Sequence, residues 1–111
     1  MNNKLSPQYE ARARIIKALA HPSRLFIVEK LQEKPCSVGE LTKMIGSDTS
    51  TISKHLSILK NESLVSDERQ GTTIFYHLKC PCILNFINCI EEVLENKTQD
   101  HINILKSCKT N

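Results

Sequence analysis

The fold is decided by one stretch, residues 37–78, which has the sequence SVGELTKMIGSDTSTISKHLSILKNESLVSDERQGTTIFYHL. It opens with Ser37, followed three residues later by Glu40, a capping-box pattern for the start of a helix. Apolar residues at helical intervals then run up to Gly46, a residue type that commonly ends helices. These apolar residues are Val38, Leu41 and Ile45. The pattern predicts a short helix over residues 38–45.

A second helix is predicted directly after that turn. Ser47 or Asp48 can cap its start, and it extends to about Lys60. Its inner side carries Ile52, Leu56 and Leu59. The periodicity then changes over residues 64–78, which predict two short strands joined by a turn around Gln70-Gly71. A short helix, a tight turn, a second helix and a hairpin together describe a winged helix-turn-helix.

Further helices are predicted on both sides of this stretch. Apolar spacing indicates one helix over residues 9–19 and another that begins near Pro22 and is closed by Pro35. A fifth helix is predicted from Pro81 to about residue 95, and another short one over residues 97–108. We expect a mainly α fold with a small β-hairpin (α+β), in a single domain over residues 1–111. Its core is expected at 9–96, and a less ordered tail at 97–111.

Composition disfavours several classes of protein. The 111 residues carry a net charge of +3, which allows an anionic partner without demonstrating one. No apolar run approaches the length of a membrane span and no signal-peptide pattern is present, so we expect a soluble, cytoplasmic protein. The 5 cysteines are irregularly spaced, which argues against a secreted disulfide scaffold. With only 3 glycines, no phosphate-binding loop and no paired Cys-x-x-Cys, an enzyme and a structural zinc module are both disfavoured.

The outer side of the helix over residues 48–60 carries small hydroxyl groups and one cation. Such a face can approach a DNA duplex closely and contact phosphates or base edges. Its members are Ser50, Thr51, Ser53, Lys54 and Ser57. Arg69, near the hairpin tip, is predicted to contact the DNA backbone. His55 lies toward the edge of the core side and is assigned equally to a groove contact and to a packed, hydrogen-bonded histidine.

Four segments, taken in order, resemble the ArsR/SmtB family of bacterial and archaeal metal-responsive repressors. They are LAHPSRLFIVEKL (19–31), SVGELTKMIG (37–46), STISKHLSILKNESLV (50–65) and RQGTTIFYHL (69–78). The resemblance covers roughly residues 11–95. It implies a homodimer whose first and last helices form the interface. It also implies binding to a pseudo-palindromic double-stranded DNA operator, with release when an inducer binds.

Two sensor sites of this family are absent from the sequence. The Cys-x-Cys pair of the arsenic and cadmium sensors falls here on Ser37 and Gly39. Cys36, one residue earlier, is interpreted as a buried small residue. The cysteines of the persulfide-sensing branch fall on Glu29 and Glu95. A generic dithiol switch through other cysteines remains open.

A third family site, the zinc site of the last helix, is altered rather than absent. Its Asp-x-His pair falls on Cys80 and Cys82, whereas its later His pair falls on Val93 and Asn96, which cannot complete a zinc site. Sulfur ligands favour softer ions: cadmium, lead, or trivalent arsenic or antimony. The two cysteines also lie at the start of the predicted last helix, where unpaired amides and the helix dipole favour the thiolate.

Cys89 is the third candidate metal ligand. It follows Cys82 by seven residues, about 10 Å along a helix axis at 1.5 Å per residue, so a single ion cannot bridge the two. Cys89 is therefore either a ligand that acts with a residue of a partner subunit or plain interface packing. Cys108, His77 and His101 have weaker claims.

These patterns lead to one functional hypothesis and one alternative. The hypothesis is a homodimeric DNA-binding transcriptional repressor, released from its operator by a thiophilic metal or metalloid ion bound through Cys80, Cys82 and Cys89. The alternative is a repressor of the same fold that responds to thiol oxidation. No enzymatic activity is expected.

Overall fold

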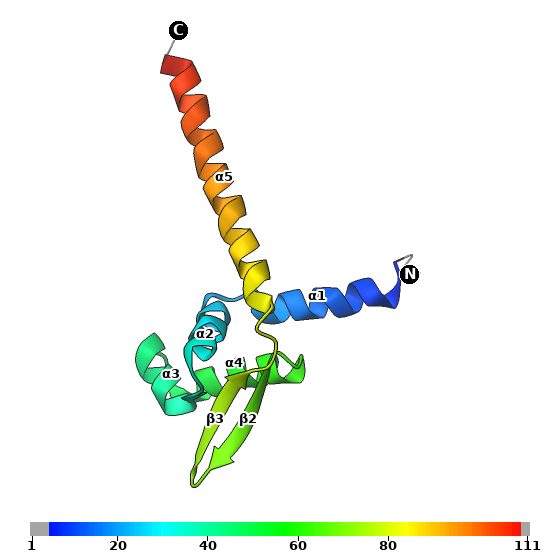
Figure 1. Ribbon diagram of the computed structural model, residues 1–111, viewed down its shortest axis with the longest axis vertical. Coiled ribbons are helices and arrows are strands. Elements are labelled where there is room, and N and C mark those ends of the chain that lie inside the picture. The colour runs from blue at the N-terminus through cyan, green and yellow to red at the C-terminus, as the bar shows by residue number, and fades with distance from the viewer. Residues whose placement is uncertain (1–4, 110–111) are drawn as a thin grey trace. The chain divides into compact units, whose positions relative to one another are not determined.

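A computed structural model describes the backbone of residues 5–109 and the side chains of residues 5–107 (Figure 1). The chain divides into two compact units, residues 1–81 and residues 82–111. The second unit contains one helix, α5 (Ile83–Lys109). The elements of the first unit are α1 (Pro7–Leu19), α2 (Pro22–Glu33), β1 (Cys36–Ser37), α3 (Val38–Ile45), α4 (Thr49–Asn61), β2 (Val65–Gln70) and β3 (Thr73–Leu78).

The helix-turn-helix has the boundaries that the sequence predicts. At the start of α3 the Ser37 hydroxyl accepts a hydrogen bond from the Glu40 N–H, and the Glu40 carboxylate accepts one from the Ser37 N–H, each at 3.1 Å. This is the predicted capping box. Gly46 ends the helix at a φ of 83°, a left-handed conformation that glycine adopts without a steric cost. Of the two candidate caps for α4, the structure uses Asp48.

The hairpin is part of a three-stranded antiparallel sheet, in the order β1-β3-β2. The predicted strands β2 and β3 pair along their full length, and the turn between them contains Gly71 at a φ of 65°. Strand β1 was not predicted, because two residues are too few to show an alternating pattern. Its pairing places Cys36 opposite Tyr76 and Ser37 opposite Phe75.

The core of the first unit forms around α4, which packs against α1, α2, α3 and β2. The predicted inner residues of α4 are fully buried, each with 0% exposure. They pack with buried apolar residues of the surrounding elements: Leu19, Ile27, Val28, Leu31, Leu41, Leu64 and Val65. Burial of this apolar surface stabilises the unit and fixes one side of α4, so its opposite side faces outward.

The last helix differs from the prediction. It begins at Ile83 rather than at Pro81, and it continues without a break to Lys109 where the sequence predicts two helices and a less ordered tail. The polar stretch near position 97 does not end the helix, because it includes no proline or glycine and its side chains form hydrogen bonds to groups of the same helix. The Thr98 hydroxyl donates to the Leu94 carbonyl, and the Gln99 amide donates to Asn103, both at 3.1 Å.

The other differences are small. Helix α1 begins at Pro7, two residues before the predicted start, because proline suits the first turn of a helix. No helix within residues 5–109 is both long enough and apolar enough to span a membrane.

Candidate functional site

The start of α4 is held by the side chain of Asp48. Its Oδ1 atom accepts a hydrogen bond from the Thr51 N–H at 2.7 Å and another from the Ser50 hydroxyl at 3.1 Å. Hydrogen bonds from Thr51 and then Ser50 hold the pKa of Asp48 below its ordinary value. The carboxylate also interacts favourably with the positive end of the helix dipole. The first turn of α4 is thereby fixed in place.

The outer face of α4 has the composition that the sequence predicts. Ser50, Lys54 and Ser57 are exposed, and Thr51 and Ser53 are half-buried. Because the side chains on the other side of α4 are fully buried, this polar face is held in one orientation. It presents hydroxyl groups and one ammonium group, which can donate to phosphate oxygens and to acceptors on base edges.

His55 does not belong to this face. Its exposure is only 8%, its Nδ1 atom lies 3.1 Å from Arg24 Nη1, and its ring packs on His21 with the centroids 4.4 Å apart. The sequence left two assignments open for His55, and the structure shows the packed, hydrogen-bonded histidine. The groove contact assigned to His55 is excluded because its ring is covered by groups from α2 and its N-cap.

The hairpin places Arg69 on its exposed surface. Arg69 is next to the last residue of β2 and pairs with Ile74 across the ladder. The hairpin is tied to α4 by an ion pair between Lys60 Nζ and Asp67 Oδ2, at 2.9 Å. The hydrogen bond that the Lys60 ammonium donates to the Asp67 carboxylate raises the pKa of Lys60. Sequence reasoning missed this pair; the available signal was two opposite charges on either side of a tight turn.

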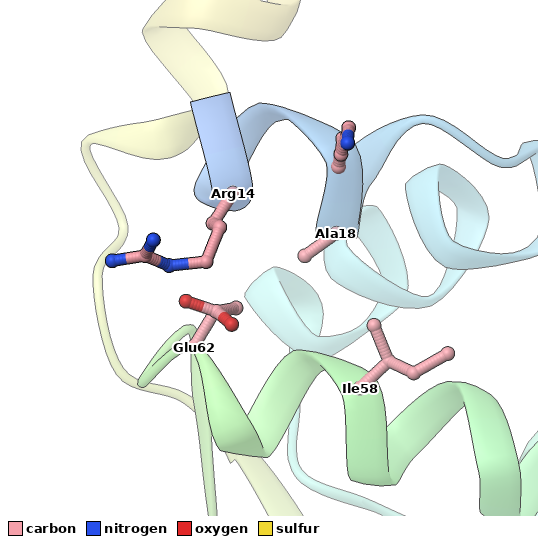
Figure 2. Close-up of a pocket in the computed structure, with 5 residues that line it drawn as sticks. Arg14, Ala18, Ile58 and Glu62 are labelled. Carbon is pink, nitrogen blue, oxygen red and sulfur yellow. The ribbon is translucent and has the colours of Figure 1, made fainter. Parts of the chain in front are cut away.

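A shallow hollow lies between α1 and α4 (Figure 2). It is lined by Arg14, Lys17, Ala18, Ile58 and Glu62, and Figure 2 shows the guanidinium of Arg14 and the carboxylate of Glu62 pointing toward one another. Its volume of about 240 Å³ is below the range of roughly 300–1,000 Å³ that is typical of small-molecule sites. The size of this hollow therefore gives no support for a small-molecule site there.

The cysteines differ sharply in their surroundings. Cys36 is 1% exposed, and its thiol donates to the Lys34 carbonyl at 3.4 Å. Burial, followed by the charge of Glu40, raises the pKa of this thiol. The interpretation of Cys36 as a buried small residue is confirmed. Cys80, Cys82 and Cys89 are free thiols and are exposed.

The start of α5 requires a correction to the predicted position of Cys82. The helix begins at Ile83, so Cys82 precedes its first turn, and the Cys82 carbonyl accepts a hydrogen bond from the Asn85 N–H at 3.1 Å. Among residues 5–107, no group of three His, Cys, Asp or Glu side chains is placed to hold a metal ion.

The side chain of Cys108 lies outside the described side chains. The backbone of α5 is nevertheless helical through this position. Cys82 and Cys108 are 26 residues apart in the sequence, which along a helix is about 39 Å. The backbone positions of Cys82 and Cys108 are therefore far apart within one chain.

Comparison with known proteins agrees with this geometry. A family model described as "Bacterial regulatory protein, arsR family" matches residues 21–67, which contain the whole helix-turn-helix. The HTH-type transcriptional regulator Rv0081 of Mycobacterium tuberculosis is 32% identical over 104 residues, which cover 93% of this chain and 91% of the relative. Its crystal structure matches with a TM-score of 0.78 over 88% of this chain and 99% of that chain.

Two further solved structures have the same architecture. NolR from Sinorhizobium fredii is 31% identical and matches with a TM-score of 0.73, over 83% of this chain and 96% of that chain. The homodimeric winged helix-turn-helix DNA-binding domain of Mb0332 from Mycobacterium bovis is 25% identical and has a TM-score of 0.71, over 86% of this chain and 88% of that chain. The chain therefore belongs to the ArsR family of winged helix-turn-helix transcriptional regulators, which bind DNA and are not enzymes.

Proposed function

We propose that this chain is a cytoplasmic, homodimeric repressor that inserts α4 into the major groove of a pseudo-palindromic operator. The observation that carries the proposal is the two-sided character of α4, with a fully buried apolar side opposite an exposed side of hydroxyl groups and Lys54. The side chains that contact DNA are Ser50, Thr51, Ser53, Lys54 and Ser57, with Arg69 of the hairpin on the backbone. A two-fold dimer presents two such helices to the two half-sites.

Exposed apolar side chains support the dimer. On α1 the exposures of Tyr9 and Ile16 are 56% and 50%. On α5 an exposed apolar series extends over more than five turns, through Phe86, Ile90, Val93, Leu94, Ile102, Ile104 and Leu105. Apolar surface of this extent on a small protein is typical of an interface. We assign both helices to the contact between two copies, as the family resemblance implies.

The inducer that we propose is a thiophilic ion: trivalent arsenic or antimony, cadmium or lead. Cys80 and Cys82 supply two exposed thiols that are separated by one residue. Such ions take thiolates in preference to oxygen ligands. Two thiols do not complete a trigonal or tetrahedral site, so the proposal requires a further ligand. We assign that role to Cys89 of the second protomer.

The position of these thiols in the chain supports coupling to DNA binding. Residues 79–82 are the connection between β3 of the hairpin and α5. A ligand that clamps this connection therefore acts on the covalent link between the DNA-contacting unit and the proposed dimer helix. Release requires that the ion bind the DNA-incompetent arrangement more tightly, by about 1–3 kcal/mol for typical coupling.

The test is a DNA-binding titration under anaerobic, reducing conditions. The probe is a duplex that the protein itself selects from a random-sequence library, and the ions are arsenite, antimonite, cadmium, lead and zinc. We expect at least one soft ion to weaken binding, and zinc to do so least. Cys80→Ser and Cys82→Ser should bind the duplex normally and resist release, and Cys89→Ser should resist it if Cys89 is a ligand. Loss of DNA binding in these variants would instead make the thiols structural.

Thiol oxidation is the alternative function, and it rests on the same exposed cysteines. It predicts that a thiol oxidant such as diamide weakens DNA binding in the absence of metal and that reductant restores it. Mass spectrometry of the oxidised protein identifies the linked cysteines. If oxidation alone controls DNA affinity and no ion changes it, the metal hypothesis is wrong.

A further inference from the structure

One arginine on α2 caps the C-terminal end of α1. Arg24 Nε donates to the Ala18 carbonyl at 2.6 Å, and Arg24 Nη2 donates to the Lys17 carbonyl at 3.4 Å. Carbonyls in the last turn of a helix have no partner within the helix. The Arg24 guanidinium supplies a partner to the Ala18 carbonyl and shares the Lys17 carbonyl with the Ala20 N–H, which donates to it at 3.1 Å. It also interacts favourably with the negative end of the helix dipole.

The same guanidinium group reaches α4. Arg24 Nη1 lies 3.1 Å from His55 Nδ1, and the His55 side chain is 8% exposed. A guanidinium group can only donate hydrogen bonds, so His55 Nδ1 must accept. This fixes His55 as a neutral imidazole whose proton is on Nε2. One side chain of α2 therefore holds the end of α1 and the middle of α4 together, provided that His55 is uncharged.

A second histidine packs beside His55. His21 is the N-cap of α2, and its Nδ1 atom accepts a hydrogen bond from the Ser23 N–H at 3.0 Å. The two imidazole rings are 4.4 Å apart between centroids. Protonation of His55 would add positive charge next to Arg24 and close to the positive end of the α2 dipole.

Two of the acidic side chains on the elements around α4 pair with lysines rather than with His55. On α3, Glu40 pairs with Lys34, and on β2, Asp67 pairs with Lys60. On α1, Lys17 and Arg14 are among the residues that line the hollow, and Figure 2 shows the guanidinium of Arg14 directed toward Glu62. Within the described side chains, the groups that act on His55 are His21 and Arg24. Burial first, and then these two groups, lower the pKa of His55.

We propose that Arg24 is a positioning residue for the recognition helix, that it acts through neutral His55, and that protonation of His55 weakens operator binding. The inference rests on α4 being the helix that contacts DNA. When His55 Nδ1 takes up a proton from solvent, two donors face each other and the hydrogen bond to Arg24 is lost. The outer face of α4 then loses one polar contact that helps to position it relative to α1 and α2, while the buried apolar packing of α4 remains.

The direction of the pH effect separates this mechanism from ordinary electrostatics. An unperturbed histidine titrates near about pH 6.5. Because the folded state favours neutral His55, the contact is complete above that pH and is lost as the pH falls further. Protonation of histidines would by itself make the protein more positive and strengthen binding to DNA. The mechanism predicts the opposite sign.

The experiment measures affinity for the self-selected duplex at constant ionic strength, at pH 7.5 and pH 5.8. We expect wild type to bind more weakly at the lower pH, by up to about sixfold for each protomer, because the pKa of His55 lies below the ordinary histidine value of about 6.5. His55→Asn keeps an acceptor near the Nδ1 position but cannot take up a proton, so its affinity should change less than about twofold. His21→Asn is the matched control, since asparagine is also a good N-cap, and it should keep the wild-type pH dependence. Arg24→Lys should bind weakly at both values, because one ammonium cannot reach two carbonyls and an imidazole.

Circular dichroism at both pH values checks that each variant is folded. If one variant unfolds, the test uses the remaining two variants. Equal or tighter binding by folded wild type at pH 5.8 overturns the inference, as does loss of the pH dependence in His21→Asn. Failure of the proposed function has a different signature. In that case Lys54→Ala binds the duplex as tightly as wild type at pH 7.5, whatever the effect of pH.

Discussion

Lys54→Ala tests whether the outer face of α4 lies against DNA. Lys54 is exposed, it is one helical turn from Ser50, and the ion pairs among the described side chains do not include it. Removal of the ammonium therefore leaves the core of the unit unchanged, and stability should change by less than about 0.5 kcal/mol. The effect on DNA binding should be much larger.

The magnitude follows from counterion release. Each phosphate contact contributes about 0.9 to the slope of log affinity against log salt concentration. A homodimer loses two such contacts, so the slope should become shallower by about 1.8. Fluorescence anisotropy with the self-selected duplex, at 50 to 300 mM salt, resolves a change of this size. A base contact by Lys54 would have another signature, since affinity would then be lost mainly for the selected sequence and not for unrelated duplexes.

Lys97→Ala is the matched control. Lys97 is an exposed lysine on α5, its removal changes the net charge by the same amount, and no DNA contact is predicted for it. Its salt slope should equal that of wild type. An unchanged slope in Lys54→Ala, or an equal loss in both variants, would show that the wrong face of the molecule has been assigned to DNA.

Three further predictions concern the fold. In urea unfolding, Gly46→Ala should destabilise the protein by roughly 1 kcal/mol, because Gly46 has a φ of 83°. Gly39→Ala is the control: it lies inside α3, an added Cβ would make only ordinary contacts, and the change should be neutral or stabilising. Leu56→Ala should cost about 2–5 kcal/mol because Leu56 is fully buried, whereas Ile58→Ala, at 39% exposure on the same helix, should cost much less. Burial raises the pKa of the Cys36 thiol, so iodoacetamide should label Cys36 more slowly than the three exposed thiols, and denaturation should remove the difference.

The parts of the fold that the sequence predicts are those with a local physical cause. The capping box of Ser37 and Glu40, the left-handed Gly46 and the cap at Asp48 lie within a few residues of the features that they determine. Strand β1 and the continuous α5 were missed for different reasons. A two-residue strand exists only through its pairing with a distant segment, and the polar stretch near residue 97 looks like a break although its side chains bond within the helix.

In the candidate site, too, features with a local cause could be predicted from the sequence and features that depend on distant residues could not. The exposed face of α4 follows from helical periodicity, so its residues could be assigned from the sequence. His55 could not be assigned, because its surroundings come from Arg24 and His21, more than thirty residues earlier. The cysteines could be placed on elements, but which of them is buried depends on the sheet that encloses Cys36.

Ser37 has two structural roles at once. It is the last residue of β1, paired opposite Phe75 of the hairpin, and its hydroxyl also caps α3. The hairpin therefore does not move independently of the helix-turn-helix, because β1, the strand that pairs with β3, continues directly into α3. In the proposed complex, α4 and the hairpin would therefore meet the groove and the flanking backbone at a fixed separation, and an operator with a different local groove width would itself have to deform to fit.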